Sequence, residues 1–203
     1  MTWVKICGIT RPEDAVAAAD LGAVAIGLVF WPESPRSVDR ARAREIVAAL
    51  PPFIAAVGVF VNQTEEAVDI ARDVGLSAVQ FHGDESPSSY RGFPVQVIKA
   101  ITVRDASALE EAGVVPDEAT VLLDAHDRVK RGGTGRVIDW EIAAMVARTR
   151  RTILSGGLTP ANVAEAISVV RPYAVDVSSG VESSPGVKDR TKLRALFDAI
   201  GRE

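Results

Sequence analysis

Eight short apolar runs recur along the chain, and each is followed by a stretch with helical spacing. The runs cover residues 3–9, 23–30, 53–61, 77–83, 95–101, 119–125, 151–156 and 173–179. They are apolar almost throughout rather than alternating with polar residues, which is typical of strands buried on both faces of a parallel sheet. Eight such strands alternating with about eight helices favour one compact (β/α)8 barrel with short loops, a single domain over residues 1–203.

A doubly wound open sheet is the alternative fold for this pattern. It would need fewer strands or a second domain. In a dinucleotide-binding fold of this kind, a Gly-rich loop would follow the first strand. The sequence there is ICGITRPED, which lacks the G-x-G-x-x-G spacing of such a turn. The barrel therefore remains the favoured prediction.

Composition argues against several classes of function. The net charge of −4 argues against a general electrostatic grip on nucleic acid or on a membrane surface. Cys7 is the only cysteine, so the chain can form neither an intramolecular disulfide nor a thiolate zinc site. The longest apolar runs are shorter than the roughly 18 residues of a spanning helix. We expect a cytoplasmic protein with no metal, nucleic-acid or membrane partner.

The barrel prediction places the active site at the carboxyl ends of the strands. Polar residues gather at those ends: Cys7, Arg36, Asn62, His82, Lys99, Asp124 and the glycine loops after the seventh and eighth strands. The two loops, LSGGLTPANV and VSSGVESSPGV, are either plain turns or a phosphate site, because small residues let backbone N–H groups approach an anion. Barrels often bind phosphate at these two loops, which favours the second interpretation.

Two of these residues have the chemistry of an acid and a base. Asp124 ends an apolar strand, where burial favours a carboxyl group that can donate a proton; it could instead cap a loop or pair with Lys130 or Arg131. Cys7 shares a strand face with Lys5, and a nearby cation favours a thiolate that acts as base or nucleophile. A lone cysteine is otherwise most often a small buried apolar residue.

Three further residues are candidates for contacting a ligand. Arg36 is either a surface cation or the partner of a substrate carboxylate. His82 either contacts substrate or hydrogen-bonds neighbouring loops, and Asp176 either faces the ligand or orients groups beneath it. The Gly-rich segment 130–140 is a loop that could close over a ligand or a solvated connection.

Taken in order, these segments resemble one known family. VKICGIT, GLVFWPESPR, VGVFVN, VQFHG, VIKA, LLDA with GGTGRVIDW, LSGGLTPANV and VDVSSGVESSPGVKD span nearly the whole chain. Together they are similar to phosphoribosylanthranilate isomerase of tryptophan biosynthesis. The opening and closing motifs are specific in combination, whereas SGG alone would carry no weight.

The resemblance implies an Amadori rearrangement of N-(5-phosphoribosyl)anthranilate to 1-(2-carboxyphenylamino)-1-deoxyribulose 5-phosphate, with no cofactor and no metal. The sequence does not fix the oligomeric state, and we expect a monomer or a homodimer. The resemblance assigns the general base to Cys7, the general acid to Asp124, and the anthranilate carboxylate to Arg36. It places the phosphate at Gly156, Gly157, Ser179 and Gly180, with His82 and Asp176 also contacting substrate.

Other phosphate-binding barrels are the rival interpretations. Indole-glycerol-phosphate synthase would need a segment ahead of the first strand, and a pentulose-phosphate epimerase would need metal-binding histidines, whereas the chain has only His82 and His126. A non-catalytic ligand-binding barrel would use Cys7 as a redox-sensing thiol. The presence of Cys7 and Asp124 at two strand ends disfavours that last alternative.

Overall fold

A computed structural model describes residues 2–90, 92–125 and 139–201. Eight parallel strands close into a barrel in the order β1 to β8, with β8 paired to β1. This confirms the predicted (β/α)8 barrel. The strands are β1 (Trp3–Ile6), β2 (Ala25–Val29), β3 (Ala55–Phe60), β4 (Ala78–Phe81), β5 (Gln96–Val103), β6 (Thr120–Ala125), β7 (Thr152–Leu154) and β8 (Ala174–Val177).

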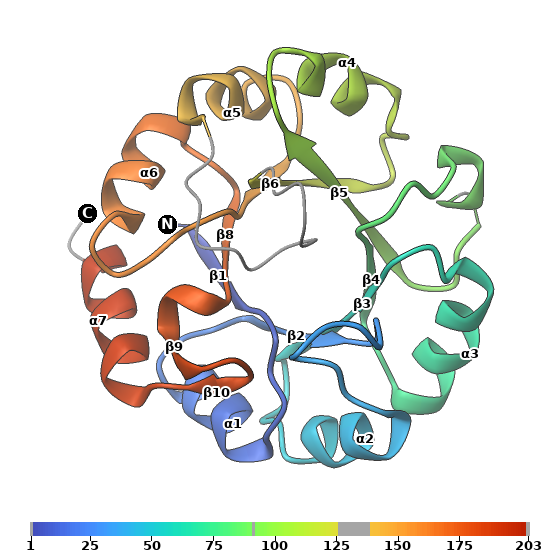
Figure 1. Ribbon diagram of the computed structural model, residues 1–203, viewed down its shortest axis with the longest axis vertical. Helices are drawn as coiled ribbons and strands as arrows, with labels where there is room; N and C mark the ends of the chain where they lie inside the picture. Colours follow the sequence, from blue (N-terminus) through green and yellow to red (C-terminus); the bar gives the residue numbers. More distant parts are fainter. Residues whose placement is uncertain (1, 91, 126–138, 202–203) are drawn as a thin grey trace.

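Helices surround the barrel on its outer side (Figure 1). They are α1 (Pro12–Asp20), α2 (Arg40–Ala48), α3 (Thr64–Val74), α4 (Ser107–Val114), α5 (Trp140–Ala147), α6 (Val163–Val170) and α7 (Arg190–Ile200). Pro12 occupies the first turn of α1, as its fixed backbone angle favours.

The described residues depart from strict alternation at two places. Between β4 and β5 there is a short 3-10 turn, η1 (Pro87–Tyr90), where the pattern predicts a helix. Pro87, Gly92 and Pro94 in this stretch oppose a longer helix. After β8 the chain forms a second 3-10 turn, η2 (Ser179–Val181), and an antiparallel hairpin of β9 (Glu182–Ser184) and β10 (Val187–Lys188) that strand patterning did not predict.

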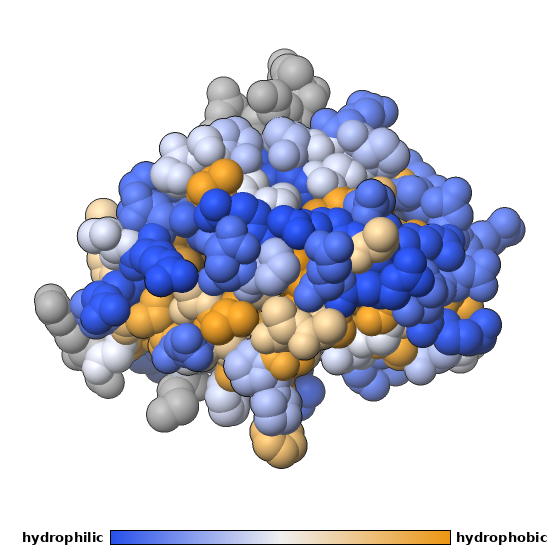
Figure 2. Space-filling model, turned by 90° about the horizontal axis from the view of Figure 1, so that it is seen from below, coloured by the Kyte–Doolittle hydropathy of each residue, from blue (hydrophilic) through white to orange (hydrophobic). Residues whose placement is uncertain are grey.

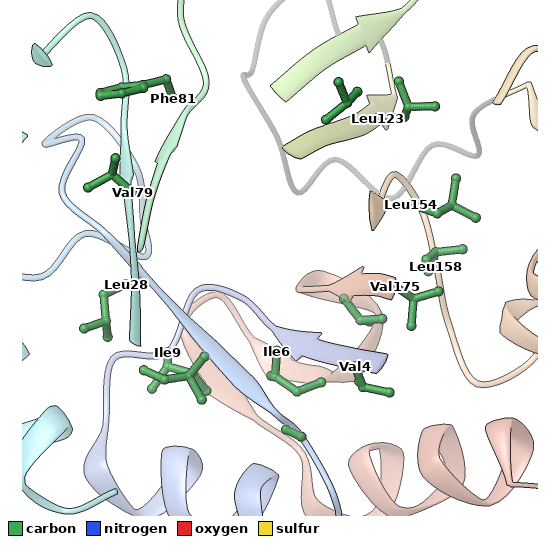
Figure 3. Packing of buried hydrophobic residues seen from close by; sticks show 14 of the residues in the cluster. Val4, Ile6, Ile9, Leu28, Val79, Phe81, Leu123, Leu154, Leu158 and Val175 are labelled. Atoms are coloured by element: carbon green, nitrogen blue, oxygen red, sulfur yellow. The ribbon is translucent and has the colours of Figure 1, made fainter. Parts of the chain in front are cut away.

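Apolar side chains fill two layers. The larger cluster lies between strands and helices, and Figure 3 shows Val4 and Ile6 of β1 with Val175 of β8 among its members. The smaller cluster fills the barrel interior with Val57, Ala78, Ile98, Ala100, Leu122, Ile153 and Ala174. Successive side chains of a strand point alternately into these two layers. Both layers are apolar, which explains why the strand sequences are apolar almost throughout.

One face of the molecule is mainly hydrophilic (Figure 2). Figure 2 shows one side of the molecule, where hydrophilic residues cover most of the surface and hydrophobic ones form small groups between them. No helix in the described part of the chain is long and apolar enough to cross a membrane.

Candidate active site

A pocket at the carboxyl end of the barrel brings together five side chains named from the sequence. They are Cys7, Arg36, His82, Asp124 and Asp176. They come from the ends of four strands and from the loop after β2, so the closed barrel alone makes them neighbours. No group of three or more metal-binding side chains occurs among the residues that the structure describes.

Strand alternation explains why these polar groups face inward. Asp124 lies two residues after Leu122, and Asp176 lies two residues after Ala174, which are both members of the interior apolar cluster. Residues two apart on a strand share a face. Each strand therefore gives an apolar residue to the middle of the barrel and a polar residue to the pocket above it.

Cys7 follows β1 and is 9% exposed. Gly27 of β2 makes room for it, because a Cβ at that position would lie 2.7 Å from the Cys7 sulfur. Burial raises the pKa of the Cys7 thiol, and the Asp176 carboxylate adds to that effect, while Lys5 and Lys188 lower it. The net direction is upward, so the predicted thiolate-favouring effect of Lys5 exists but burial outweighs it.

Lys5 is 3% exposed inside the barrel. Its Nζ lies 2.9 Å from Asp176 Oδ2 and donates a hydrogen bond of 3.0 Å to Gln80 Oε1. Burial by itself would lower the pKa of Lys5, but attraction to Asp176 and to the sulfur of Cys7 raises it overall. Lys5 is therefore a cation beneath the pocket. Asp176 Oδ1 is buried without a hydrogen-bond partner among the described residues.

His82 links this network to the opposite wall of the pocket. Its Nε2 lies 3.2 Å from Asp124 Oδ2, and its Nδ1 lies 3.3 Å from Gln80 Nε2. Asp124 is 4% exposed, and its Oδ1 also accepts the backbone N–H of Ala125 at 2.9 Å.

Arg36 is held by an acidic residue from the hairpin after β8. Its Nη2 lies 2.7 Å from Glu182 Oε2, and its Nε donates to Glu182 Oε1 at 2.9 Å. Lys188 donates to the same Glu182 Oε1 at 2.8 Å and to the carbonyl oxygen of Cys7 at 2.6 Å. Burial raises the pKa of Glu182, but Arg36 and Lys188 lower it by more. Glu182 is therefore held as a carboxylate.

The two predicted phosphate loops contact each other beside the pocket. Gly156 and Gly157 have φ angles of 86° and 68°, a left-handed conformation that glycine adopts without strain. Gly180 lies so close to the carbonyl oxygen of Leu158 that a Cβ there would collide with it. Ser179 and Gly180 begin the turn η2, so their backbone N–H groups have no partner within that turn. These four residues do not line the pocket itself, whereas their neighbours Ser155 and Ser178 do.

Two polar residues that the sequence predicts at strand ends, Lys99 and Asn62, lie outside the pocket, and Lys99 lies in the middle of β5 (Gln96–Val103). Lys99 falls between Ile98 and Ala100, which face the barrel interior, so its side chain leaves on the other face and pairs with Glu85 at 2.8 Å. The amide oxygen of Asn62 accepts the N–H of Asp84 at 2.8 Å. Both residues support the loop that follows His82. His126, Lys130, Arg131 and most of the Gly-rich segment lie outside the described residues.

The pocket also contains residues that the sequence patterns did not single out. Gln80 and Trp31 line it, and Glu182 lies behind Arg36. Gln80 had a usable signal, because it is a polar residue on the same face of an apolar strand as His82. Glu182 had none, since its partner lies 146 residues away in the chain.

Comparison with known proteins identifies the family of the chain. The family model for N-(5'phosphoribosyl)anthranilate (PRA) isomerase matches residues 4–199. The chain belongs to this family. It is 50% identical over 199 residues to N-(5'-phosphoribosyl)anthranilate isomerase of Trichlorobacter lovleyi, covering 97% of each chain. The family comprises isomerases of tryptophan biosynthesis, and this chain is one of them.

Solved structures of the family share the whole fold. Phosphoribosyl anthranilate isomerase of Thermotoga maritima is 42% identical with a TM-score of 0.92, and both chains are covered completely. Another structure of the family contains reduced 1-(o-carboxyphenylamino)-1-deoxyribulose 5-phosphate; it is 41% identical with a TM-score of 0.89 over all of both chains. A third solved structure, 40% identical with a TM-score of 0.90 over all of both chains, is of monomers of the dimeric Thermotoga maritima enzyme.

Proposed function

We propose that this chain isomerises N-(5'-phosphoribosyl)anthranilate with Asp124 as general acid and Cys7 as general base. The observation that supports this most directly is that both side chains line one pocket, Asp124 from β6 and Cys7 from the end of β1. These two strands lie on different sides of the closed barrel. A sugar bound between them would have one group on each side.

Asp124 acts first in this scheme. It donates its proton to the furanose ring oxygen, the bond from that oxygen to C1 of the sugar breaks, and the nitrogen lone pair forms the C1–N double bond of an iminium ion. The buried carboxyl group, with one oxygen facing His82, is suited to this transfer. The iminium ion then withdraws electrons from C2 and makes its proton acidic.

Cys7 removes that proton from C2. The electrons of the broken C–H bond form the C1–C2 double bond, and the π electrons of the C1–N double bond return to the nitrogen, giving a neutral enolamine that tautomerises to the ketone. Because burial raises the pKa of Cys7, the thiolate is a minor species in the free protein. The positive iminium ion forms beside it at the step that needs the base, and a nearby cation favours the thiolate.

Arg36 positions the anthranilate half. The ion pair with Glu182 uses Nε and Nη2, so among the described contacts Nη1 is the group left to meet a substrate carboxylate. Val29, Trp31, Val59 and Val61 line the same pocket and supply an apolar wall for the aromatic ring.

The sugar phosphate has two groups of partners. Asp176 Oδ1 is a buried acceptor without a donor among the described residues, and a sugar hydroxyl would satisfy it. The loops with Gly156, Gly157, Ser179 and Gly180 offer backbone N–H groups to the phosphate. The protein is a monomer or, like the dimeric Thermotoga maritima enzyme, a homodimer.

Growth of a tryptophan auxotroph that lacks only this isomerase tests the proposal. The gene should restore growth without tryptophan, and the Cys7→Ala gene, expressed at equal level, should not. Purified protein should convert the substrate, and the decrease of the anthranilate fluorescence with time measures this conversion. Binding of substrate without conversion would overturn the proposal in favour of a ligand-binding barrel.

A further inference from the structure

A continuous chain of polar contacts crosses the barrel along the wall and floor of the pocket. It runs from Asp176 through Lys5, Gln80 and His82 to Asp124, with successive separations of 2.9, 3.0, 3.3 and 3.2 Å. The proposed mechanism uses the last member as acid and gives Gln80 no role. Gln80 is nevertheless 1% exposed and contacts both neighbours in this chain.

The orientation of the Gln80 amide follows from Lys5. An ammonium group has three donors and no acceptor, so the atom facing Lys5 must be the amide oxygen. The amide nitrogen then faces His82 Nδ1, and an NH2 group can only donate. His82 Nδ1 must therefore be the unprotonated nitrogen of the ring.

A neutral imidazole with unprotonated Nδ1 carries its hydrogen on Nε2. That N–H points to Asp124 Oδ2 at 3.2 Å. Protonation of His82 at Nδ1 would set two donors against each other, unless the amide of Gln80 turned over. Turning the amide would place its NH2 group against the Lys5 ammonium, so neither arrangement is favourable.

We propose that Gln80 is a positioning residue that keeps His82 neutral as the Nε2–H tautomer, so that a proton bound by the His82–Asp124 pair resides on Asp124. This rests on the proposed role of Asp124 as general acid. It explains how the carboxyl group can be the proton donor although an imidazole nitrogen lies 3.2 Å from it. The proton is kept on the group that faces the sugar ring oxygen.

The ring nitrogens of His82 give a readout that does not depend on activity. The chain has two histidines, so a His126→Asn background leaves His82 as the sole imidazole. Nitrogen-15 NMR of this variant at neutral pH should show Nε2 protonated and Nδ1 unprotonated. An imidazolium or an Nδ1–H tautomer would overturn the proposal while leaving the acid role of Asp124 to its own test.

Gln80→Glu is the matched variant, because it keeps the size and replaces the donor by an acceptor. One carboxylate oxygen would still accept from Lys5, and the other would accept a hydrogen from His82 Nδ1. We expect the NMR signals to report protonation of Nδ1, and kcat to fall at least tenfold with KM changed less than threefold. Unchanged ring signals in a folded variant would overturn the proposal.

Gln80→Leu tests whether the hydrogen bond from Gln80, rather than the volume of its side chain, sets the tautomer of His82. It removes the donor without offering an acceptor, so both neutral tautomers should become populated in the NMR spectrum. A spectrum identical to that of the parent would show that Gln80 does not set the tautomer. The parent spectrum alone remains decisive if either variant fails to fold.

Discussion

Glu182 binds two nitrogens of the Arg36 guanidinium, at 2.7 and 2.9 Å, although the two residues lie 146 positions apart in the chain. A two-point ion pair fixes both the position and the plane of the guanidinium. The side chain proposed to meet the anthranilate carboxylate is therefore aimed by the hairpin that follows β8.

Replacing Glu182 by glutamine tests this aiming. The amide keeps one acceptor but turns a donor toward Arg36, so the guanidinium loses its fixed plane. We expect KM to rise roughly tenfold, since a hydrogen bond to a charged group is worth about 1.5–3 kcal/mol, with a smaller change in kcat. Steady-state kinetics measure both; Arg36→Ala should raise KM as well, and an unchanged KM in both variants would place Arg36 outside the substrate site.

Gly8 makes room for the stem of Arg36. A Cβ at Gly8 would lie 2.5 Å from Arg36 Cδ, and the φ angle of Gly8 is +71°. Gly8→Ala should therefore raise KM as Arg36 is displaced. Gly75→Ala is the matched control, because Gly75 has a φ of +79° and nothing within 4 Å of a Cβ. Both variants should lose stability from backbone strain, about 1 kcal/mol, but only Gly8→Ala should affect KM; equal kinetic effects would contradict this.

The principle that a barrel has its active site at the carboxyl ends of its strands predicted much of this candidate site. The residues that it placed wrongly have a physical explanation. Cys7, His82, Asp124 and Asp176 could be found because a parallel barrel gathers the ends of its strands at one rim. Lys99 was misplaced because a shift of one residue sends a side chain to the opposite face of a strand.

Contacts between distant segments could not be found in the same way. The pairing of Arg36 with Glu182 depends on the β9–β10 hairpin, which has no alternating pattern long enough to predict. The direction in which the pKa of Cys7 is shifted could not be predicted from the sequence either. It depends on whether the effect of burial exceeds that of the nearby Lys5.

The thiol of Cys7 should titrate above the usual value for cysteine. Burial and Asp176 raise its pKa, while Lys5 lowers it. Lys5→Met should therefore raise the pKa further, and Asp176→Asn should lower it. Since Cys7 is the only cysteine, the ultraviolet absorbance of the thiolate against pH, with Cys7→Ser as blank, reports this group alone. A lower pKa in Lys5→Met would contradict the electrostatic description.

Inorganic phosphate should inhibit competitively if the loops after β7 and β8 hold the substrate phosphate. Gly180→Ala should weaken that inhibition, because a Cβ there collides with Leu158 and separates the two loops. Gly113→Ala is the control, since a Cβ at Gly113 meets nothing within 4 Å. Inhibition constants for phosphate in the three proteins measure the effect. If phosphate does not compete with the substrate in the parent protein, the proposal that these loops bind the substrate phosphate is contradicted.

The central claim is that Cys7 and Asp124 carry out the proton transfers, and single-variant turnover tests it most directly. Cys7→Ala and Asp124→Asn should each lower kcat by about 10²–10⁴-fold, the usual contribution of a general acid or base. Circular dichroism should match the parent, and the affinity for the reduced product analogue should stay within about threefold. A kcat within tenfold of the parent in either folded variant would contradict the assignment of that residue.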